Sequence, residues 1–155
     1  MKLPERLAAL TDFYESLTPQ SLARLPEFYA EDARFSDPFN DVTGHAAIAH
    51  IFADMFEKLD SPRFEVTGRY VPTAESFPDE AVLRWVMRFR SRLLGPGEHV
   101  IEGTSRLRFA ADGRVTEHQD FWDGSALLAR LPWIGAPLRA LRRRLAAGNQ
   151  STASL

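Results

Sequence analysis

The sequence predicts an α+β fold, in which N-terminal helices pack on one face of an antiparallel sheet and a C-terminal helical tail follows. Three observations support this prediction. Up to about residue 59, apolar residues recur at steps of three and four, which is typical of amphipathic helices. From about residue 64 to residue 122 they alternate with polar residues, which is typical of strands with one solvated face. Helices and strands that are segregated along the chain favour α+β over α/β folds.

Three helices are expected in the first third of the chain. The first covers residues 3–17, where leucines recur on one face. The second begins at a threonine-proline pair and covers about residues 18–29, although Pro26 must kink or divide it. The third covers residues 45–59, where isoleucine, phenylalanine and methionine mark a single face.

Turn signals separate the expected strands. Gly95-Pro96-Gly97 follows one long strand, and Asp112-Gly113 is a strong signal for a two-residue hairpin. These signals predict an antiparallel meander in the second half of the chain. The strands are expected at residues 33–36, 64–70, 83–90, 106–109 and 115–122.

The end of the chain returns to a helical pattern. Residues 125–155 are predicted to be a basic amphipathic extension of the domain formed by residues 1–124. Helices are expected over residues 125–131 and 138–147, with Gly148 as the C-cap of the second. The segment contains no acidic residue, and its arginines are Arg130, Arg139, Arg142, Arg143 and Arg144.

Composition excludes several classes of function. A formal net charge of −2 gives no reason to expect nucleic acid as a partner. The absence of cysteine excludes disulfides, thiolate nucleophiles and cysteine-bearing metal sites. The four histidines lack ligand spacing, so neither a metal nor another cofactor is expected. No apolar run reaches 18 residues and the N-terminal segment carries early charges, so a cytoplasmic protein is expected.

Two segments resemble a known superfamily. Residues 28–38 (FYAEDARFSDP) and residues 44–48 (GHAAI) are similar to the second-helix, first-strand and third-helix region of the nuclear transport factor two-like proteins. That superfamily includes ketosteroid isomerase, SnoaL-like polyketide cyclases and limonene epoxide hydrolase. Residues 5–123 fit its order of elements. The resemblance implies a cone-shaped α+β barrel, in which three helices plug a strongly curved sheet around a pocket, and a homodimer formed through the sheet.

The isomerase pattern transfers to this chain only in part. The resemblance implies that Asp37 stands at the position of the general base. The tyrosine of the oxyanion hole would fall at Phe13, with Tyr14 next to it, and the protonated aspartate would fall near Ser105. In the isomerase that aspartate is a neutral carboxylic acid, which donates a hydrogen bond to the oxyanion together with the tyrosine. Because this chain lacks both donors at those positions, steroid isomerisation is not expected.

Asp37 has two interpretations that the sequence leaves open. The proline after it favours an extended backbone at a strand end, which suits a carboxylate directed into a cavity. Desolvation would make such a carboxylate a better base. Alternatively, its side chain accepts hydrogen bonds from the backbone N–H groups of Phe39 or Asn40 in an Asx turn.

The strand over residues 115–122 holds the second candidate group. A period of two places Thr116, His118, Asp120 and Trp122 on one face, and the resemblance favours that face as the wall of the cavity. SnoaL-like cyclases are known for an acid–base aspartate and a nearby histidine in this region. The opposite register would direct the other set of side chains inward.

We expect Asp37, His118 and Asp120 to converge on one ligand pocket. Its expected lining combines residues from the helices and from the inner face of the sheet: Phe13, Tyr14, Phe52, Met55, Phe56, Trp85, Ser105, Leu107 and Trp122.

Three functions remain open. The first is a cofactor-independent acid–base enzyme of isomerase, cyclase or hydrolase type that acts on a small apolar molecule. The second is a binding protein that holds the same kind of ligand without chemistry, because both functions need an apolar pocket with a few polar groups. The third is a dimeric scaffold. For the basic tail we favour packing across the pocket mouth or a partner subunit over contact with a membrane surface.

Overall fold

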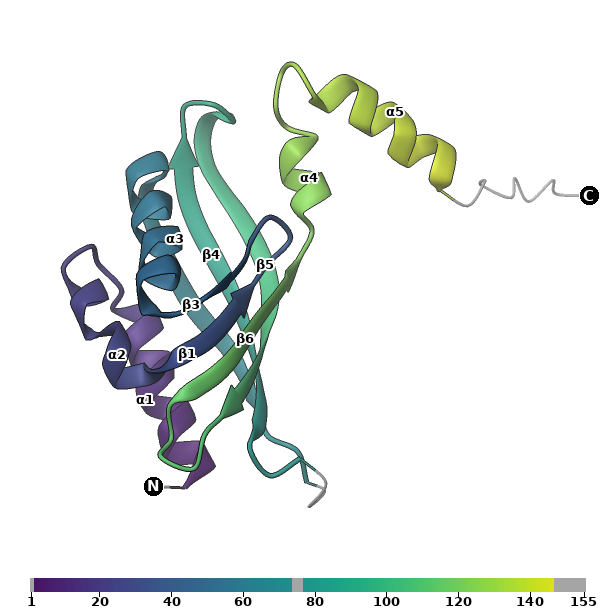
Figure 1. Ribbon diagram of the computed structural model, residues 1–155. Helices are drawn as coiled ribbons and strands as arrows, with labels where there is room; N and C mark the ends of the chain where they lie inside the picture. The colour runs from purple at the N-terminus through teal and green to yellow at the C-terminus, as the bar shows by residue number, and fades with distance from the viewer. Residues whose placement is uncertain (1, 74–76, 147–155) are drawn as a thin grey trace, which may run out of the picture. The chain divides into compact units, whose positions relative to one another are not determined.

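A six-stranded sheet lies at the centre of the first of the chain's two units, Met1–Asp123 and Gly124–Leu155 (Figure 1). This computed structural model describes residues 2–73 and 77–146. The strand order in the sheet is β2-β1-β6-β5-β4-β3. The strands are β1 (Tyr29–Ser36), β2 (Asp41–Thr43), β3 (Asp60–Tyr70), β4 (Glu80–Ser91), β5 (Gly95–Phe109) and β6 (Val115–Trp122).

The helices of this unit lie on one side of the sheet (Figure 1). They are α1 (Leu3–Glu15), the single turn α2 (Leu25–Phe28) and α3 (His45–Lys58). The expected second helix is divided: residues Ser21–Arg24 form a 3-10 turn, and α2 begins only at the residue before Pro26. A proline lacks the backbone N–H that the interior of an α-helix needs. It is tolerated in the first turn, where that N–H has no partner within the helix. Tyr29, expected in the helical stripe, begins β1 instead.

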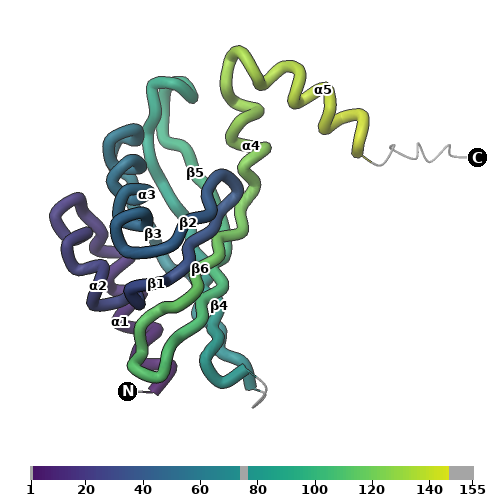
Figure 2. The backbone as a smooth tube through the Cα atoms, viewed as in Figure 1, coloured from purple at the N-terminus to yellow at the C-terminus, as the bar shows by residue number. Residues whose placement is uncertain are grey.

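The sheet is mixed rather than purely antiparallel. The expected meander is confirmed, since β3, β4, β5 and β6 pair antiparallel in chain order. However, β1 runs parallel to β6, with Phe35 opposite His118, and the tubes of these two strands lie side by side in Figure 2. The chain turns back through β2, which was not predicted, and α3 then leads to the opposite edge of the sheet at β3. The sheet remains open, with β2 and β3 as its edges.

The core lies between the helices and the inner face of the sheet. On β4 the alternating residues expected to face inward are all buried, from Leu83 to Phe89. Leu7 and Leu10 of α1 and Ile48 of α3 are also fully buried against this layer. The change in sequence period therefore predicted the two layers correctly, because each period places one apolar face toward the core.

Between residues 124 and 146, the described part of the second unit forms two short helices, α4 (Gly124–Leu128) and α5 (Gly135–Leu145). Gly135 is needed where α5 begins, because a Cβ atom there would clash with the carbonyl oxygen of Ala129. The predicted end of the last helix at residue 147 and its cap Gly148 lie outside the described residues. Among the described helices, none combines the length and the apolar character that a membrane span requires.

Candidate functional site

The inner face of β6 presents a buried histidine and an aspartate. His118 is 3% exposed, and its Nε2 atom lies 2.7 Å from Oδ1 of Asp120. On the opposite face, Glu117 pairs with Arg106 and Arg108 at 3.3 and 3.6 Å. The register that places His118 and Asp120 inward is therefore the one the structure adopts.

His118 contacts hydroxyl groups with both ring nitrogens. Its Nδ1 atom lies 2.6 Å from the Tyr29 hydroxyl and 3.2 Å from the Tyr14 hydroxyl. The two tyrosine hydroxyls are themselves 2.6 Å apart. On the other side of the ring, Nε2 also lies 3.2 Å from the Ser105 hydroxyl. The imidazole thus joins a tyrosine of α1 and a tyrosine of β1 to a serine of β5 and a carboxylate of β6.

Ser105 connects Asp120 to a tryptophan. It stands opposite Asp120 in the β5–β6 ladder and donates a short hydrogen bond to the same Oδ1 atom that His118 contacts. Its hydroxyl oxygen accepts a hydrogen bond of 2.9 Å from Nε1 of Trp85. Gly103 makes room for that ring, because a Cβ atom at this position would lie 2.5 Å from it.

The directions of these hydrogen bonds follow from the chemistry of the groups. An ionised Asp120 can only accept hydrogen bonds, so Nε2 of His118 carries a proton and donates a hydrogen bond to the carboxylate. In the neutral imidazole, Nδ1 is then an acceptor for the Tyr29 hydroxyl, and Tyr14 donates to Tyr29. If Nδ1 gains a proton, both tyrosine bonds reverse and the hydrogen of Tyr14 becomes free to point into the cavity.

Burial keeps both tyrosines protonated. Desolvation is the main cause that raises the pKa of Tyr14 well above its usual value, and the nearby Tyr29 and Asp120 add to the shift. Desolvation also raises the pKa of Tyr29, and the hydrogen bond from Tyr14 opposes this in part. Both groups therefore serve as neutral hydroxyls at physiological pH.

A small cavity adjoins this network. Its free volume is about 20 Å³, which is enough for about one water molecule. Pockets that hold drug-sized ligands are typically about 300–1,000 Å³. Aromatic side chains fill most of the space that a ligand would need. The lining residues are Tyr14, Phe52, Phe64, Val66, Trp85, Ser105, His118 and Asp120.

A larger, open groove lies on the other side of Asp120. Its volume is about 310 Å³, and it runs along the ends of β1 and β6. Trp122 forms part of its wall, with its ring packed edge-on against Phe39 at a centroid distance of 5.4 Å. Asp120 borders both the groove and the interior cavity. The groove is lined by Ser36, Asp37, Pro38, Gln119, Asp120, Phe121 and Trp122.

The structure does not bring Asp37 into the cavity beside His118. Its Oδ1 atom accepts hydrogen bonds of 2.7 Å from the backbone N–H groups of Phe39 and Asn40. The side-chain amide of Asn40 donates to both of its carboxylate oxygens at 3.0 Å. Asp37 thus closes the turn between β1 and β2, as the alternative interpretation of its sequence context proposed, and borders the groove.

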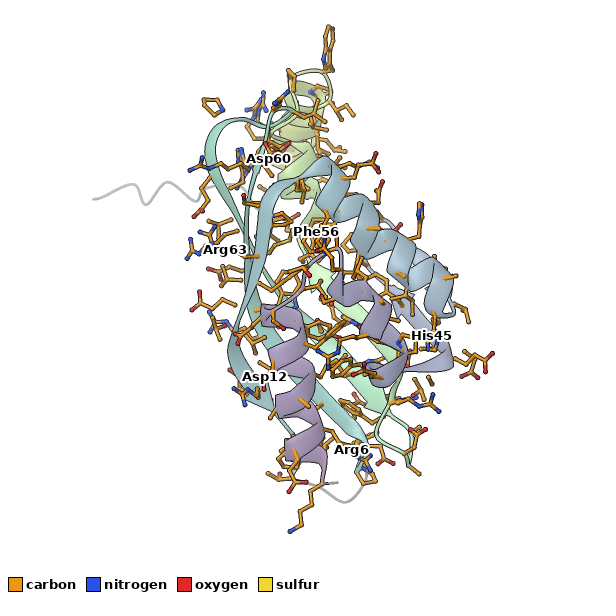
Figure 3. The ribbon with its side chains drawn as sticks, turned by 90° about the vertical axis from the view of Figure 1, so that its left-hand side faces the viewer. Arg6, Asp12, His45, Phe56, Asp60 and Arg63 are labelled. Atoms are coloured by element: carbon orange, nitrogen blue, oxygen red, sulfur yellow. The ribbon has the colours of Figure 1, made fainter. Side chains whose placement is uncertain are left out.

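Several expected lining residues lie elsewhere. Phe13 is buried against Phe28, with the ring centroids 4.3 Å apart. Tyr14, and not Phe13, lines the cavity. Leu107 is fully buried in the core. Met55 and Phe56 are half-buried, and Figure 3 shows Phe56 among the side chains that fill the space beside α3.

Three residues of the interior cavity and its hydrogen-bond network were not predicted. Phe64 and Val66 line the cavity from β3, and their alternation in the sequence was the signal that could have included them. Tyr29 had no such signal, because it was expected in a helix and contacts His118 only through the parallel pairing of β1 with β6.

The described residues contain no group of three or more histidine, aspartate or glutamate side chains placed to hold a metal ion. The site described above consists of one histidine, one carboxylate and four neutral donors or acceptors. Such a set of groups is suited to moving protons and not to binding a cation of high charge.

Comparison with known proteins agrees with the fold. The model of the SnoaL-like domain family matches residues 10–118. No curated protein matches the chain. A hypothetical protein with a ketosteroid isomerase-like fold from Catenulispora acidiphila, solved in complex with trimethylamine, is 21% identical. The alignment covers 88% of this chain and 96% of that one, with a TM-score of 0.66.

Two other solved structures are similar. A protein from Jannaschia, assigned provisionally to the SnoaL-like polyketide cyclases, is 18% identical over 87% of this chain and 92% of that one, with a TM-score of 0.69. A nuclear transport factor two-like protein of unknown function from Burkholderia pseudomallei is 14% identical over 85% and 99%, with a TM-score of 0.67. At these identities the likeness shows the fold alone. The family match, which covers most of the chain, shows that the chain belongs to the SnoaL-like domain family.

Proposed function

We propose that this protein binds a small, largely apolar molecule and catalyses a proton transfer on it without a cofactor. Asp120 and His118 are the proposed acid–base pair. The observation that carries the proposal is their part-buried hydrogen bond of 2.7 Å at the wall between the groove and the interior cavity. A carboxylate and an imidazole in contact are the groups that most often exchange protons with a substrate.

The groove is the proposed entry for the ligand. Its volume of about 310 Å³ falls at the lower end of the range for ligand pockets, whereas the interior cavity holds about one water. Pro38, Phe121 and Trp122 supply apolar contact area, and Asp120 supplies the reactive group. Both donors to Asp120 act on Oδ1, so we propose that the substrate meets Oδ2.

The proposed reaction class is isomerisation or cyclisation of a carbonyl compound. Asp120 removes a proton from a carbon next to the carbonyl group, and a proton that can exchange with solvent on Asp120 is returned at a carbon or oxygen of the substrate, so no oxidant is required. A proton that His118 takes from solvent at Nδ1 before the substrate binds reverses the two tyrosine hydrogen bonds. Tyr14 then donates to a substrate carbonyl oxygen that fills the water-sized interior cavity, which places a hydrogen-bond donor where negative charge forms.

A second candidate is ligand binding without chemistry. The observation that favours it is the nearly filled interior, because a substrate would reach His118 only if Phe52, Phe64 or Trp85 moved. The structural neighbour solved with trimethylamine supports the general capacity of this fold to hold a small molecule.

The test uses proton exchange, which needs no knowledge of the natural substrate. A panel of small ketones and β-diketones is incubated with the protein in D₂O, and exchange at the carbon next to the carbonyl is followed by NMR. Asp120→Asn should slow enzyme-dependent exchange by about 100-fold or more. The matched control, Asp37→Asn, changes a carboxylate in the same groove and should alter the rate less than about threefold, as expected of a group outside the reaction.

Two outcomes would contradict the catalytic proposal. The first is an Asp120→Asn variant that exchanges protons as fast as the wild type. The second is a ligand that quenches the fluorescence of Trp122 while no exchange occurs, a result that favours the binding protein.

We also propose a homodimer formed through the outer face of the sheet. This face carries alternating charges, with Arg84 3.9 Å from Glu102, and also the half-exposed side chain of Phe121. Two copies related by a two-fold axis can match such a pattern to itself. Sedimentation equilibrium should give twice the chain mass of 17.5 kDa. A mass of one chain at micromolar concentration would contradict the proposal.

A further inference from the structure

The charge of the chain is divided unevenly between its two units. Residues 124–155 contain five arginines and no acidic residue. All 21 acidic residues and the other 14 basic residues lie in residues 1–123, which therefore carry a net charge of −7 against +5 for the second unit. A segment with this composition is attracted to negatively charged surfaces that the first unit repels.

The second unit also exposes large apolar side chains. Ile134, Leu138, Leu141 and Leu145 follow one another at steps of four, three and four, which aligns them along one side of α5. The exposed fraction is 50% for Ile134, 52% for Leu141 and 77% for Leu145. Trp133, just before the helix, is 91% exposed. Grouped apolar side chains of this kind mark an interaction surface.

Local contacts hold these side chains on an ordered helix. The backbone N–H of Gly135 donates to the carbonyl of Leu131 at 2.8 Å, which connects the turn to the start of α5. Arg139 donates a short hydrogen bond to the carbonyl of Ala129, so the guanidinium group joins the two helices. With about 3.6 residues per turn, Arg142 and Arg144 flank the apolar stripe of α5 on its two sides, and Arg143 lies opposite it.

We propose that α5 and Trp133 bind the surface of a membrane that contains anionic lipids. Arg143 and Arg144 are exposed and complement the phosphate groups of such lipids. Leu141 and Leu145 would enter the acyl boundary, and a tryptophan is favoured at the level of the headgroups.

Lipid is favoured over nucleic acid because of the apolar stripe. A nucleic acid would neutralise the arginines, but it would leave the exposed leucines in water.

The test is co-sedimentation of the full chain with vesicles. Phosphatidylcholine vesicles are compared with vesicles that contain about one-third phosphatidylglycerol, at low and at physiological salt. Binding is expected only with the anionic lipid, and it should weaken as salt rises. Emission from Trp133 should shift to the blue on binding, and Trp133→Phe should remove the shift.

Matched variants separate charge from apolar contact. Arg143→Gln with Arg144→Gln should weaken binding roughly 30-fold, from about fivefold for each arginine. Arg90→Gln with Arg92→Gln makes the same change in net charge on exposed residues of the first unit and should leave binding unchanged. Leu141→Gln with Leu145→Gln should abolish binding while circular dichroism remains as in the wild type.

Several outcomes would overturn the proposal. One is equal binding to neutral and anionic vesicles. Another is an unchanged affinity in the Arg143 and Arg144 double variant. A third is a wild type that binds no vesicle, together with a leucine double variant that is a monomer where the wild type is a dimer. That result would make the apolar stripe a subunit contact. Binding to a DNA duplex but to no vesicle would assign the arginines to nucleic acid.

Discussion

Asp37 and Asp120 border the same groove, but different kinds of donor hold their carboxylates. Asp37 accepts hydrogen bonds from two backbone N–H groups and from the amide of Asn40. Asp120 accepts from the imidazole of His118 and from the hydroxyl of Ser105. Backbone and amide donors keep their protons at every physiological pH, whereas an imidazole can exchange its proton.

This comparison explains why proximity to a groove does not identify a catalytic carboxylate. Asp37 has its hydrogen-bonding capacity committed to the turn between β1 and β2. Asp120 belongs to a chain of groups that can reverse direction, from Tyr14 through Tyr29 and His118. Substitutions in the network of Asp120 and in the turn of Asp37 should therefore have different effects.

The largest effect on stability is expected in the buried network. His118→Ala removes a side chain that is 3% exposed and leaves the Tyr29 hydroxyl without its acceptor. The free energy of unfolding should fall by about 2–4 kcal/mol, from the cavity and the unpaired groups together. Urea denaturation measures it. Glu117→Ala, on the outer face of the same strand, should cost less than about 1 kcal/mol, and equal losses in the two variants would contradict the prediction.

Alkaline pH should destabilise the network in a specific direction. Burial raises the pKa of Tyr14 and of Tyr29, so the folded state holds these protons more tightly than the unfolded chain does. Their contribution is fully present below pH 10, the usual tyrosine value, and is lost as the pH rises above it. The unfolding free energy should then fall by about 1.4 kcal/mol per pH unit for each tyrosine.

Tyr14→Phe provides the control for this pH dependence. The variant lacks one of the two buried hydroxyls and should show about half of the alkaline slope. Denaturation at a series of pH values from about 8 to about 11.5 measures it. A slope that remains unchanged in Tyr14→Phe would show that these tyrosines are not the source.

A smaller loss is expected at the turn. Asp37→Ala removes the acceptor for two backbone N–H groups and should lower the unfolding free energy by about 1–2 kcal/mol. Asp37→Asn retains one carbonyl acceptor, so we expect a loss of about 1 kcal/mol. Thermal unfolding of both variants measures the effect. If both were neutral and proton exchange fell strongly, Asp37 would take the role proposed for Asp120.

The smallest effect is expected at Asp41, whose carboxylate binds the exposed Arg34 at 2.6 Å. The hydrogen bond from Arg34 lowers the pKa of Asp41, so any contribution is present at neutral pH and is lost as the pH falls below about 4. Because both groups are solvated, Asp41→Asn should leave the thermal midpoint unchanged at about pH 7. A midpoint that fell as far as in Asp37→Ala would show that the turn depends on the ion pair.

Apart from β2 and the division of the second helix, the sequence alone was sufficient to predict the order of helices and strands in the first unit and the pairing of the meander. Each depends on local properties: the period of apolar residues, and turn signals such as Asp112-Gly113. The candidate pair His118 and Asp120 was also predictable, because two residues of one strand that are two positions apart share a face. The family resemblance supported the correct choice between the two possible registers.

Only the tertiary structure decided which other side chains complete the site. Tyr29 and His118 are 89 positions apart in the chain, and they meet because β1 pairs parallel with β6, a pairing for which no local signal exists. The role of Asp37 depended on whether Asn40 and the backbone of Phe39 would turn toward its carboxylate. Period and turn chemistry are determined within a few residues, whereas the lining of a cavity depends on how distant strands curve around it. For that reason Phe64 and Val66 replaced Phe13 and Leu107 in the lining of the site.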